Sequence, residues 1–150
     1  AMDAILSGWV PGNQSIMYTF GSPRVGNLAF AQKLVNSISE IWRITHWKDF
    51  APHVPLCKKE KGVCITGEGQ KDYNKTGQVI WYAWHVWPEI FFDEDSKTST
   101  ICTGAEDPKC ADQFALTETD VEDHYNYMGV HLLCGNKFPL LDLPPQSIRI

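Results

Sequence analysis

The chain has 150 residues, of which 43% are hydrophobic and 21% are charged, and its formal net charge is -5. This is the composition of an ordinary globular domain, and it excludes a disordered or collagen-like chain. The negative charge argues against binding to nucleic acid or to an anionic membrane surface, and no apolar run reaches the roughly 18 to 20 residues that span a bilayer.

The first residues have the pattern of an amphipathic helix that is already under way. Met2, Ile5, Leu6 and Trp9 fall on one side of this predicted helix. A signal peptide would begin with a basic segment followed by an apolar one, and neither is present. We therefore expect the true start of the protein to lie upstream of Ala1.

The stretch from residue 15 to residue 47 has the pattern of two parallel strands joined by a helix. Ser15 to Pro23 is apolar and ends in Gly and Pro, which predicts a buried strand. Residues 28 to 38 have helical spacing of apolar side chains, with Asn27 placed as the cap. Glu40 to Trp47 then returns to the alternation of a strand. Such a unit predicts an α/β fold with a parallel sheet.

The second half of the chain is less regular. Residues 57 to 78 are polar and predict a long loop. Val79 to Phe92 is apolar on both faces, which favours a hairpin or bent strand in the core over an apolar substrate wall. Residues 93 to 122 predict an acidic, loop-rich segment, residues 123 to 133 a short helix or turn, and the proline-containing tail from residue 137 an extended segment.

Five cysteines lie at positions 57, 64, 102, 110 and 134, without a C-x-x-C pair. This spacing argues against a zinc ribbon or a thioredoxin-type pair, so we expect no metal site. Two short loops closed by disulfides, Cys57 to Cys64 and Cys102 to Cys110, are the better interpretation. Cys134 then has no partner, and a cysteine in a missing N-terminal segment would supply one.

Two glycosylation sequons lie at Asn13 and Asn74, and sequons of this kind are used in secreted proteins, as disulfides are. Disulfides and sequons together indicate a secreted protein. The alternative is that the sequons occur by chance and that the cysteines are free thiols.

Asp49 directly follows the second predicted strand. In a parallel sheet the active site forms where loops leave the carboxyl ends of the strands. A carboxylate there can accept the Nδ1 proton of an imidazole and hold the tautomer that a general base needs. The alternative is a turn residue ahead of Phe-Ala-Pro, for which aspartate is favoured. The residues alone leave both interpretations open.

The position of each histidine decides which is the best candidate for a base. In the order serine, aspartate, histidine, the base follows Asp49 in the chain. His53 lies too close to Asp49, His85 lies inside the aromatic run, where a core role is expected, and His131 lies in an apolar turn. His124 follows a polar loop from which its ring can project into a cleft, so it is the preferred candidate.

The chain offers no serine nucleophile of the expected kind. No G-x-S-x-G elbow is present. Ser22 precedes Pro23, which has no amide hydrogen to donate to an oxyanion, so this serine cannot serve.

Three segments in order carry a specific resemblance: "YTFGSPRVGN" (residues 18 to 27), "RITHWKDFAPHVP" (residues 43 to 55) and "DHYNYMG" (residues 123 to 129). Together they resemble the class 3, or fungal-type, triacylglycerol lipases of the α/β-hydrolase fold, and most closely the secreted, nematode-like members. The cysteine-bounded "CTGAEDPKC" resembles the same members. The resemblance covers nearly the whole chain but only the C-terminal part of the catalytic domain of that family.

The resemblance implies roles for particular residues. The acid of the family falls on Asp49 and the base on His124, while His85 and Glu89 fall on structural positions. The nucleophile elbow belongs upstream, so residues 1 to 150 would be a partial α/β-hydrolase domain without its N-terminal half. Parallel strands with a crossover helix, an aromatic hairpin and disulfide-closed loops would make up this portion.

The implied function is that of a lipase of lipid metabolism, a carboxylic ester hydrolase acting by a Ser-Asp-His triad. This chain would carry only the Asp and the His, so we expect it to be inactive alone. The substrate would be an acylglycerol or another ester lipid, met at a lipid-water interface, with no cofactor. The alternatives are a non-catalytic secreted lipid-binding module and an inert fragment.

Overall fold

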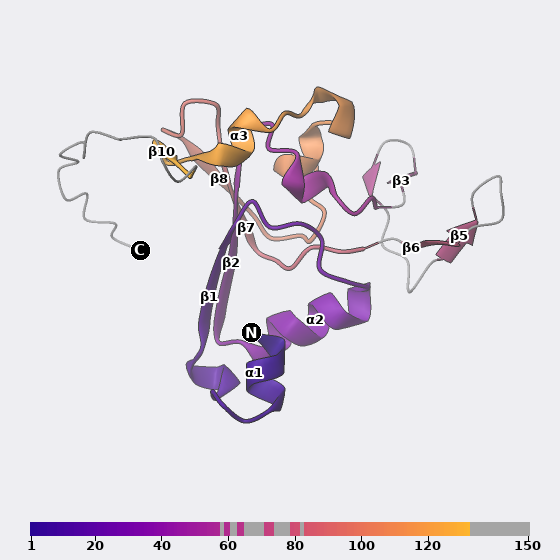
Figure 1. Ribbon diagram of the computed structural model, residues 1–150, viewed down its shortest axis with the longest axis vertical. Coiled ribbons are helices and arrows are strands. Elements are labelled where there is room, and N and C mark those ends of the chain that lie inside the picture. The colour runs from indigo at the N-terminus through magenta and orange to yellow at the C-terminus, as the bar shows by residue number, and fades with distance from the viewer. Residues whose placement is uncertain (58, 61–62, 65–70, 74–78, 82, 133–150) are drawn as a thin grey trace.

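The computed structural model describes residues 1–57, 59–60, 63–64, 71–73, 79–81 and 83–132. Among these residues the centre is a four-stranded sheet in the order β1-β2-β7-β8 (Figure 1). Its strands are β1 (Ile16–Phe20), β2 (Glu40–His46), β7 (Glu89–Phe92) and β8 (Ser99–Cys102). β2 pairs in parallel with both β1 and β7, and β8 pairs antiparallel with β7. The predicted parallel sheet is therefore confirmed.

Short two-stranded ladders lie outside this sheet. They are β3 (Lys59–Glu60) with β4 (Val63–Cys64), β5 (Lys71–Tyr73) with β6 (Val79–Trp81), and β9 (Asn126–Tyr127) with β10 (Val130–His131). The predicted loop from residue 57 to residue 78 falls largely outside the described residues.

The helices are α1 (Met2–Leu6), α2 (Leu28–Ser37) and α3 (Glu122–Tyr125). Single 3-10 turns lie at Gly12–Gln14, Ala51–His53, Ala111–Gln113 and Leu116–Glu118. α2 begins where it was predicted, because the Asn27 side chain accepts a 2.9 Å hydrogen bond from the Phe30 N–H and so caps the helix. No helix within the described ranges is long and apolar enough to cross a membrane.

One apolar cluster joins the N-terminal helices to the sheet, and its buried members are Met2, Leu34, Ile38, Ile41 and Val86. α1 and α2 lie together on one side of the sheet (Figure 1). The expectation for α1 was only half right, because Met2 is buried whereas Leu6 and Trp9 are exposed. α1 ends at Leu6, so Trp9 lies beyond the helix and does not share its buried side.

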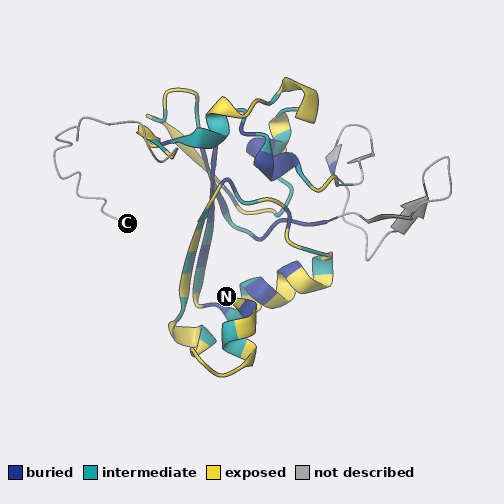
Figure 2. Ribbon diagram, in the orientation of Figure 1, coloured by how far each residue is buried: buried dark blue, intermediate teal, exposed yellow. Residues whose placement is uncertain are grey.

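The prediction that the first strand is buried is wrong. Ile16, Tyr18 and Phe20 along β1 are exposed and alternate with half-buried residues, as Figure 2 shows. The physical reason is that these three residues alternate along the strand and so point to one face of the sheet, which is exposed in the described part of the chain. β1 is also an edge strand there, so no strand flanks its outer side. A run of apolar residues does not reveal whether a second neighbour covers it.

The prediction of one hairpin or bent strand over residues 79 to 92 is also wrong. β6 pairs with β5, whereas β7 joins the central sheet beside β2. The two strands are separated by the segment that contains Pro88, which has no N–H for a ladder. The side chains of the buried stretch from Ala83 to Val86 do belong to the core, as expected.

The segment from residue 93 to residue 122 contains a strand, β8, that was not predicted. Its last residue, Cys102, packs with Phe91, Cys110 and Ala111 in a second buried cluster. The sequence pattern of β8 is uninformative because three of its four residues are exposed.

The segment after α3 is a hairpin. β9 and β10 are joined by Met128 and Gly129, which have φ angles of 51° and 76°. A two-residue turn with both φ angles positive matches the twist of the strands. The predicted short helix is confirmed at residues 122 to 125, and Figure 1 shows α3 and this hairpin at the carboxyl end of β2.

Candidate active site

Asp49 lies in the turn that follows β2, with 1% of its surface exposed. The backbone N–H of Asp49 donates to the carbonyl of His46 at 3.0 Å, and Asp49 Oδ1 accepts the N–H of Ala51 at 2.8 Å. The carboxylate is thus held by its own loop, at the end of the sheet where loops leave the carboxyl ends of parallel strands.

His124 lies beside Asp49 although 75 residues separate them in the chain. Nδ1 of His124 is 3.0 Å from Asp49 Oδ1 and 3.1 Å from Oδ2. The His124 side chain is 30% exposed while that of Asp49 is 1% exposed, so the imidazole stands between a buried carboxylate and solvent. Its ring also packs edge-on against Phe50, with the ring centroids 5.3 Å apart.

Backbone hydrogen bonds bring the two loops together. Lys48 O accepts the N–H of Asp120 at 3.0 Å, and Asp120 O accepts the N–H of Phe50 at 3.2 Å, which makes a parallel bridge between Asp49 and Asp120. α3 starts two residues after this bridge and presents His124 over the carboxylate.

Tyr127 is the residue of this site that the sequence analysis missed. Its hydroxyl donates to Asp49 Oδ2, and the residue is 2% exposed. Burial, together with the negative charge of Asp49, raises the pKa of Tyr127, so the phenol remains protonated and a donor. The only sequence signal is its place three residues after His124 in "DHYNYMG".

Gly21, the residue after β1, makes room for this pair. Its φ is +55°, and a Cβ at this position would lie 2.6 Å from Asp49 Oδ2 and 2.8 Å from His124 Nδ1. Any larger residue would therefore push the carboxylate and the imidazole apart.

The other histidine candidates for a base are held elsewhere. Burial lowers the pKa of His53, whose ring nitrogens lie 3.0 Å from Asp49 O and 3.1 Å from Ala111 O. Burial and the nearby Arg43 charge lower the pKa of His85 to about 3. His85 is in the core, as predicted, with Nε2 2.7 Å from Pro52 O.

The predicted disulfides are confirmed as Cys57–Cys64 and Cys102–Cys110. Asn13 is exposed in the 3-10 turn at Gly12–Gln14. Asn74 and Cys134 lie outside the described residues.

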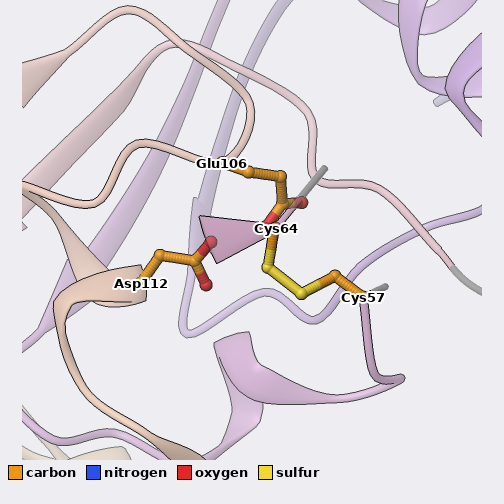
Figure 3. Close-up of side chains that lie close together, drawn as sticks. All are labelled: Cys57, Cys64, Glu106 and Asp112. Atoms are coloured by element: carbon orange, nitrogen blue, oxygen red, sulfur yellow. A yellow bond between two sulfur atoms is a disulfide. The ribbon is translucent and has the colours of Figure 1, made fainter. Parts of the chain in front are cut away.

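One cluster has the composition of a metal site. The ligand atoms of Cys57, Cys64, Glu106 and Asp112 all lie within 4.8 Å of one another (Figure 3). The two sulfurs are joined in a disulfide, however, and the Arg24 guanidinium is the cation among these groups. Arg24 Nη2 donates to Glu106 Oε2 at 2.7 Å, to Asp112 Oδ1 at 3.0 Å and to Cys64 Sγ at 3.5 Å.

The arrangement can hold and move a proton. A buried carboxylate fixes the Nδ1 side of a half-exposed imidazole and leaves Nε2 to exchange a proton with a reacting group. In the described part of the chain no hydroxyl or thiol is hydrogen-bonded to His124, and Ser22 donates to the carbonyl of Pro23.

The chain is similar in sequence to known lipases. Residues 1–59 match the family described as "Lipase (class 3)". Lipase ZK262.3 of Caenorhabditis elegans is 31% identical over 126 residues, which are 76% of this chain and 35% of that protein.

Solved structures of lipases share the fold. A fungal lipase in an inhibitor complex is 25% identical with a TM-score of 0.62. The triacylglyceride lipase of Rhizomucor miehei is 23% identical with a TM-score of 0.61. Each likeness covers 87% of this chain and 42% of the other. This chain therefore has the α/β-hydrolase fold over a portion of its relatives' length.

Proposed function

The chain belongs to the class 3 lipase family, and we propose that Asp49 and His124 are the acid and the base of an ester hydrolase that acts on lipids. The single observation that carries this proposal is the contact of His124 Nδ1 with both oxygens of a buried carboxylate, while its ring remains 30% exposed. A partly exposed histidine with a buried aspartate partner is an arrangement that suits general-base catalysis.

In the proposed reaction His124 Nε2 takes the proton of a serine hydroxyl as that oxygen attacks the ester carbonyl. The same nitrogen then gives the proton to the leaving alcohol, and water repeats the sequence to release the acid. Asp49 keeps the proton on Nδ1 and stabilises the imidazolium. The Tyr127 hydroxyl donates to Asp49 Oδ2 and the Ala51 N–H donates to Asp49 Oδ1, so these two hydrogen bonds fix the orientation of the carboxylate.

We propose that the serine comes from a segment outside residues 1 to 150. Gly21 ends β1 beside the two side chains, and the outer side of β1 is unpaired in the described residues, so a neighbouring strand could bring a nucleophile to this end of the sheet. Without it the isolated chain is expected to hydrolyse no ester, because the loss of the nucleophile lowers turnover by about 10⁶-fold.

The proposed setting is extracellular. Two disulfides and an exposed sequon at Asn13 support it, since disulfides persist where the environment is oxidising. The proposed substrates are acylglycerols or other ester lipids, in keeping with the name of the nematode relative.

A chimera tests the proposal. The segment of the Caenorhabditis elegans lipase that aligns with this chain is replaced by residues 1 to 150, and hydrolysis of a chromogenic ester is measured. We expect turnover in the chimera, a loss of about 10⁶-fold in His124→Ala and a loss of about 10⁴-fold in Asp49→Asn.

His131→Asn is the matched control, because this histidine lies on β10 and its Nε2 is 3.4 Å from Glu122 Oε1. It should retain the rate of the chimera. A folded chimera that binds lipid without hydrolysing ester would contradict the proposal and favour a lipid-binding module. A rate that persists in His124→Ala would contradict the role of that residue.

A further inference from the structure

His46 ends β2 almost wholly inside the molecule, with 3% of its surface exposed. Its two ring nitrogens face carbonyl oxygens of different segments. Nδ1 lies 3.2 Å from the backbone oxygen of Asp123, and Nε2 lies 3.3 Å from that of Glu94. His46 precedes Asp49 in the chain, so the order of a hydrolase triad excludes it as the base and gives it no role.

The Asp123 contact places His46 next to the proposed base, since Asp123 immediately precedes His124. The Asp123 N–H donates to Asp120 Oδ1 at 2.9 Å, and Asp123 Oδ2 accepts the N–H of Lys48 at 3.3 Å. Asp123 is therefore fixed by its N–H, its carboxylate and its carbonyl, and the carbonyl is held by His46. Figure 1 shows the end of β2 directly beneath α3.

The ring of His46 also reaches the support of the proposed acid. It packs against Tyr127 with the ring centroids 5.8 Å apart, and the Tyr127 hydroxyl donates to Asp49. One buried imidazole thus contacts the residue that precedes the base and the residue that holds the acid.

The number of protons decides which contact His46 can make. A neutral imidazole donates through one nitrogen only, yet both nitrogens face acceptors. Asp123 Oδ1 lies 3.8 Å from Nδ1, and this nearby carboxylate favours a proton on that nitrogen over one on Nε2.

We infer that His46 is a positioning residue whose Nδ1–H donates to Asp123 O and fixes the turn that carries His124. The catalytic meaning of this inference rests on the proposed function. The hydrogen bond itself does not, and it can be tested in a chain that hydrolyses nothing.

The first test uses the unaltered chain. Nitrogen-15 NMR of the histidine rings reports which nitrogen carries the proton. We expect His46 Nδ1 to be protonated throughout the pH range in which the chain stays folded. A neutral His46 ring protonated only on Nε2 would overturn the inference, whatever the chain does or does not catalyse.

The second test uses two variants with opposite geometry. The amide nitrogen of asparagine can take the place of Nδ1, whereas that of glutamine reaches the place of Nε2. His46→Asn should therefore keep the low-field proton signal of the His124 Nδ1–H bonded to Asp49, and His46→Gln should lose it. If the His124 Nδ1–H signal persisted in both folded variants, or vanished in both, the positioning role would be contradicted. If either variant does not fold, the tautomer of His46 in the unaltered chain decides.

In the active chimera the same pair should differ in kcat and not in KM. His46→Gln should lower kcat by about tenfold, the factor that corresponds to one hydrogen bond, and His46→Asn should restore most of it. A chimera without activity would contradict the proposed function and leave the NMR result on His46 to stand by itself.

Discussion

The two ends of β2 are held by different kinds of interaction. At one end Ile41 packs with Leu34, Ile38 and other apolar side chains under α1 and α2. Toward the other end Ile44 is buried as well, but the remaining buried side chains are polar. They are Arg43, Thr45, His46 and, just beyond the strand, Asp49.

The polar end of β2 is the one that positions side chains accurately. Apolar contacts are non-directional, so the first end does not fix the direction of any one side chain. The second end consists of hydrogen bonds between buried groups, each with a required direction and partner. Side chains that must meet within about 3 Å are held at the second end.

The largest effect is expected from removal of a buried charge at the polar end. Glu89 pairs with Arg43 and also accepts from Thr45 Oγ1 and, at 3.1 Å, from the N–H of Ala111. Glu89→Ala leaves these donors without a partner and should lower the free energy of unfolding by about 4 kcal/mol, measured by urea denaturation.

The double variant Arg43→Met with Glu89→Leu is the control. Because it removes both charges, it should recover the part of the loss that comes from the unpaired Arg43. The Thr45 hydroxyl and the Ala111 N–H remain without their acceptor, so the recovery should be partial. If the double variant were as unstable as the single one, volume and not charge would explain the result.

A smaller effect is expected at the apolar end. Leu34 is 6% exposed within the first cluster. Leu34→Ala should lower the free energy of unfolding by about 3 kcal/mol through lost burial and a cavity. It should leave the low-field proton signal of His124 in place, because the polar network is untouched. Loss of that signal in a folded variant would show that the two ends are not independent.

Tyr127→Phe should lower the free energy of unfolding by less than Leu34→Ala does, and it should also change the environment of His124. It removes the Tyr127 hydroxyl as a donor to Asp49 Oδ2 and leaves His124 Nδ1, 3.1 Å away, as the other contact of that oxygen. The loss of one hydrogen bond to a buried carboxylate costs about 2 kcal/mol. The low-field signal of His124 should shift in this variant. An unshifted signal would indicate that Tyr127 fills space and does not hold the acid.

The smallest effect is a dependence of stability on pH. Burial lowers the pKa of His85 to about 3, below its value of about 6.5 in an unfolded chain. The unfolded state therefore takes up the proton first, so the stability supplied by neutral His85 is present above about pH 6.5 and is lost as the pH falls. We expect a loss of roughly 1 kcal/mol between pH 7 and pH 5.5.

Thermal unfolding at several pH values measures this loss, and His85→Gln provides the comparison. The variant should show a flatter profile over the same range because the titrating group is gone. Identical slopes in the two proteins would place the titration on another group.

Much of the fold could be predicted from local patterns in the sequence. The helix after Asn27, the parallel arrangement of β1 and β2, and both disulfides depend on neighbours in sequence and could be recognised from spacing. Asp49 and His124 were chosen from three ordered motifs, and the described geometry brings them together.

What the sequence could not reveal depends on distant partners. Tyr127 looks like any core tyrosine until Asp49, 78 residues away, is placed against it. The exposure of β1 depends on which segments cover one face of the sheet. Three of the four residues of β8 are exposed, so its sequence lacks the alternation that would have predicted a strand.

The most direct test of the pairing of Asp49 with His124 is the tautomer of His124 in the 150-residue chain, measured by nitrogen-15 NMR. If Asp49 holds this ring, Nδ1 carries the proton in the neutral state, and Asp49→Asn moves the proton to Nε2 because the amide can donate to Nδ1. A ring protonated on Nε2 in the unaltered chain, or one that is indifferent to Asp49→Asn, would contradict the claim that these two residues act as a pair.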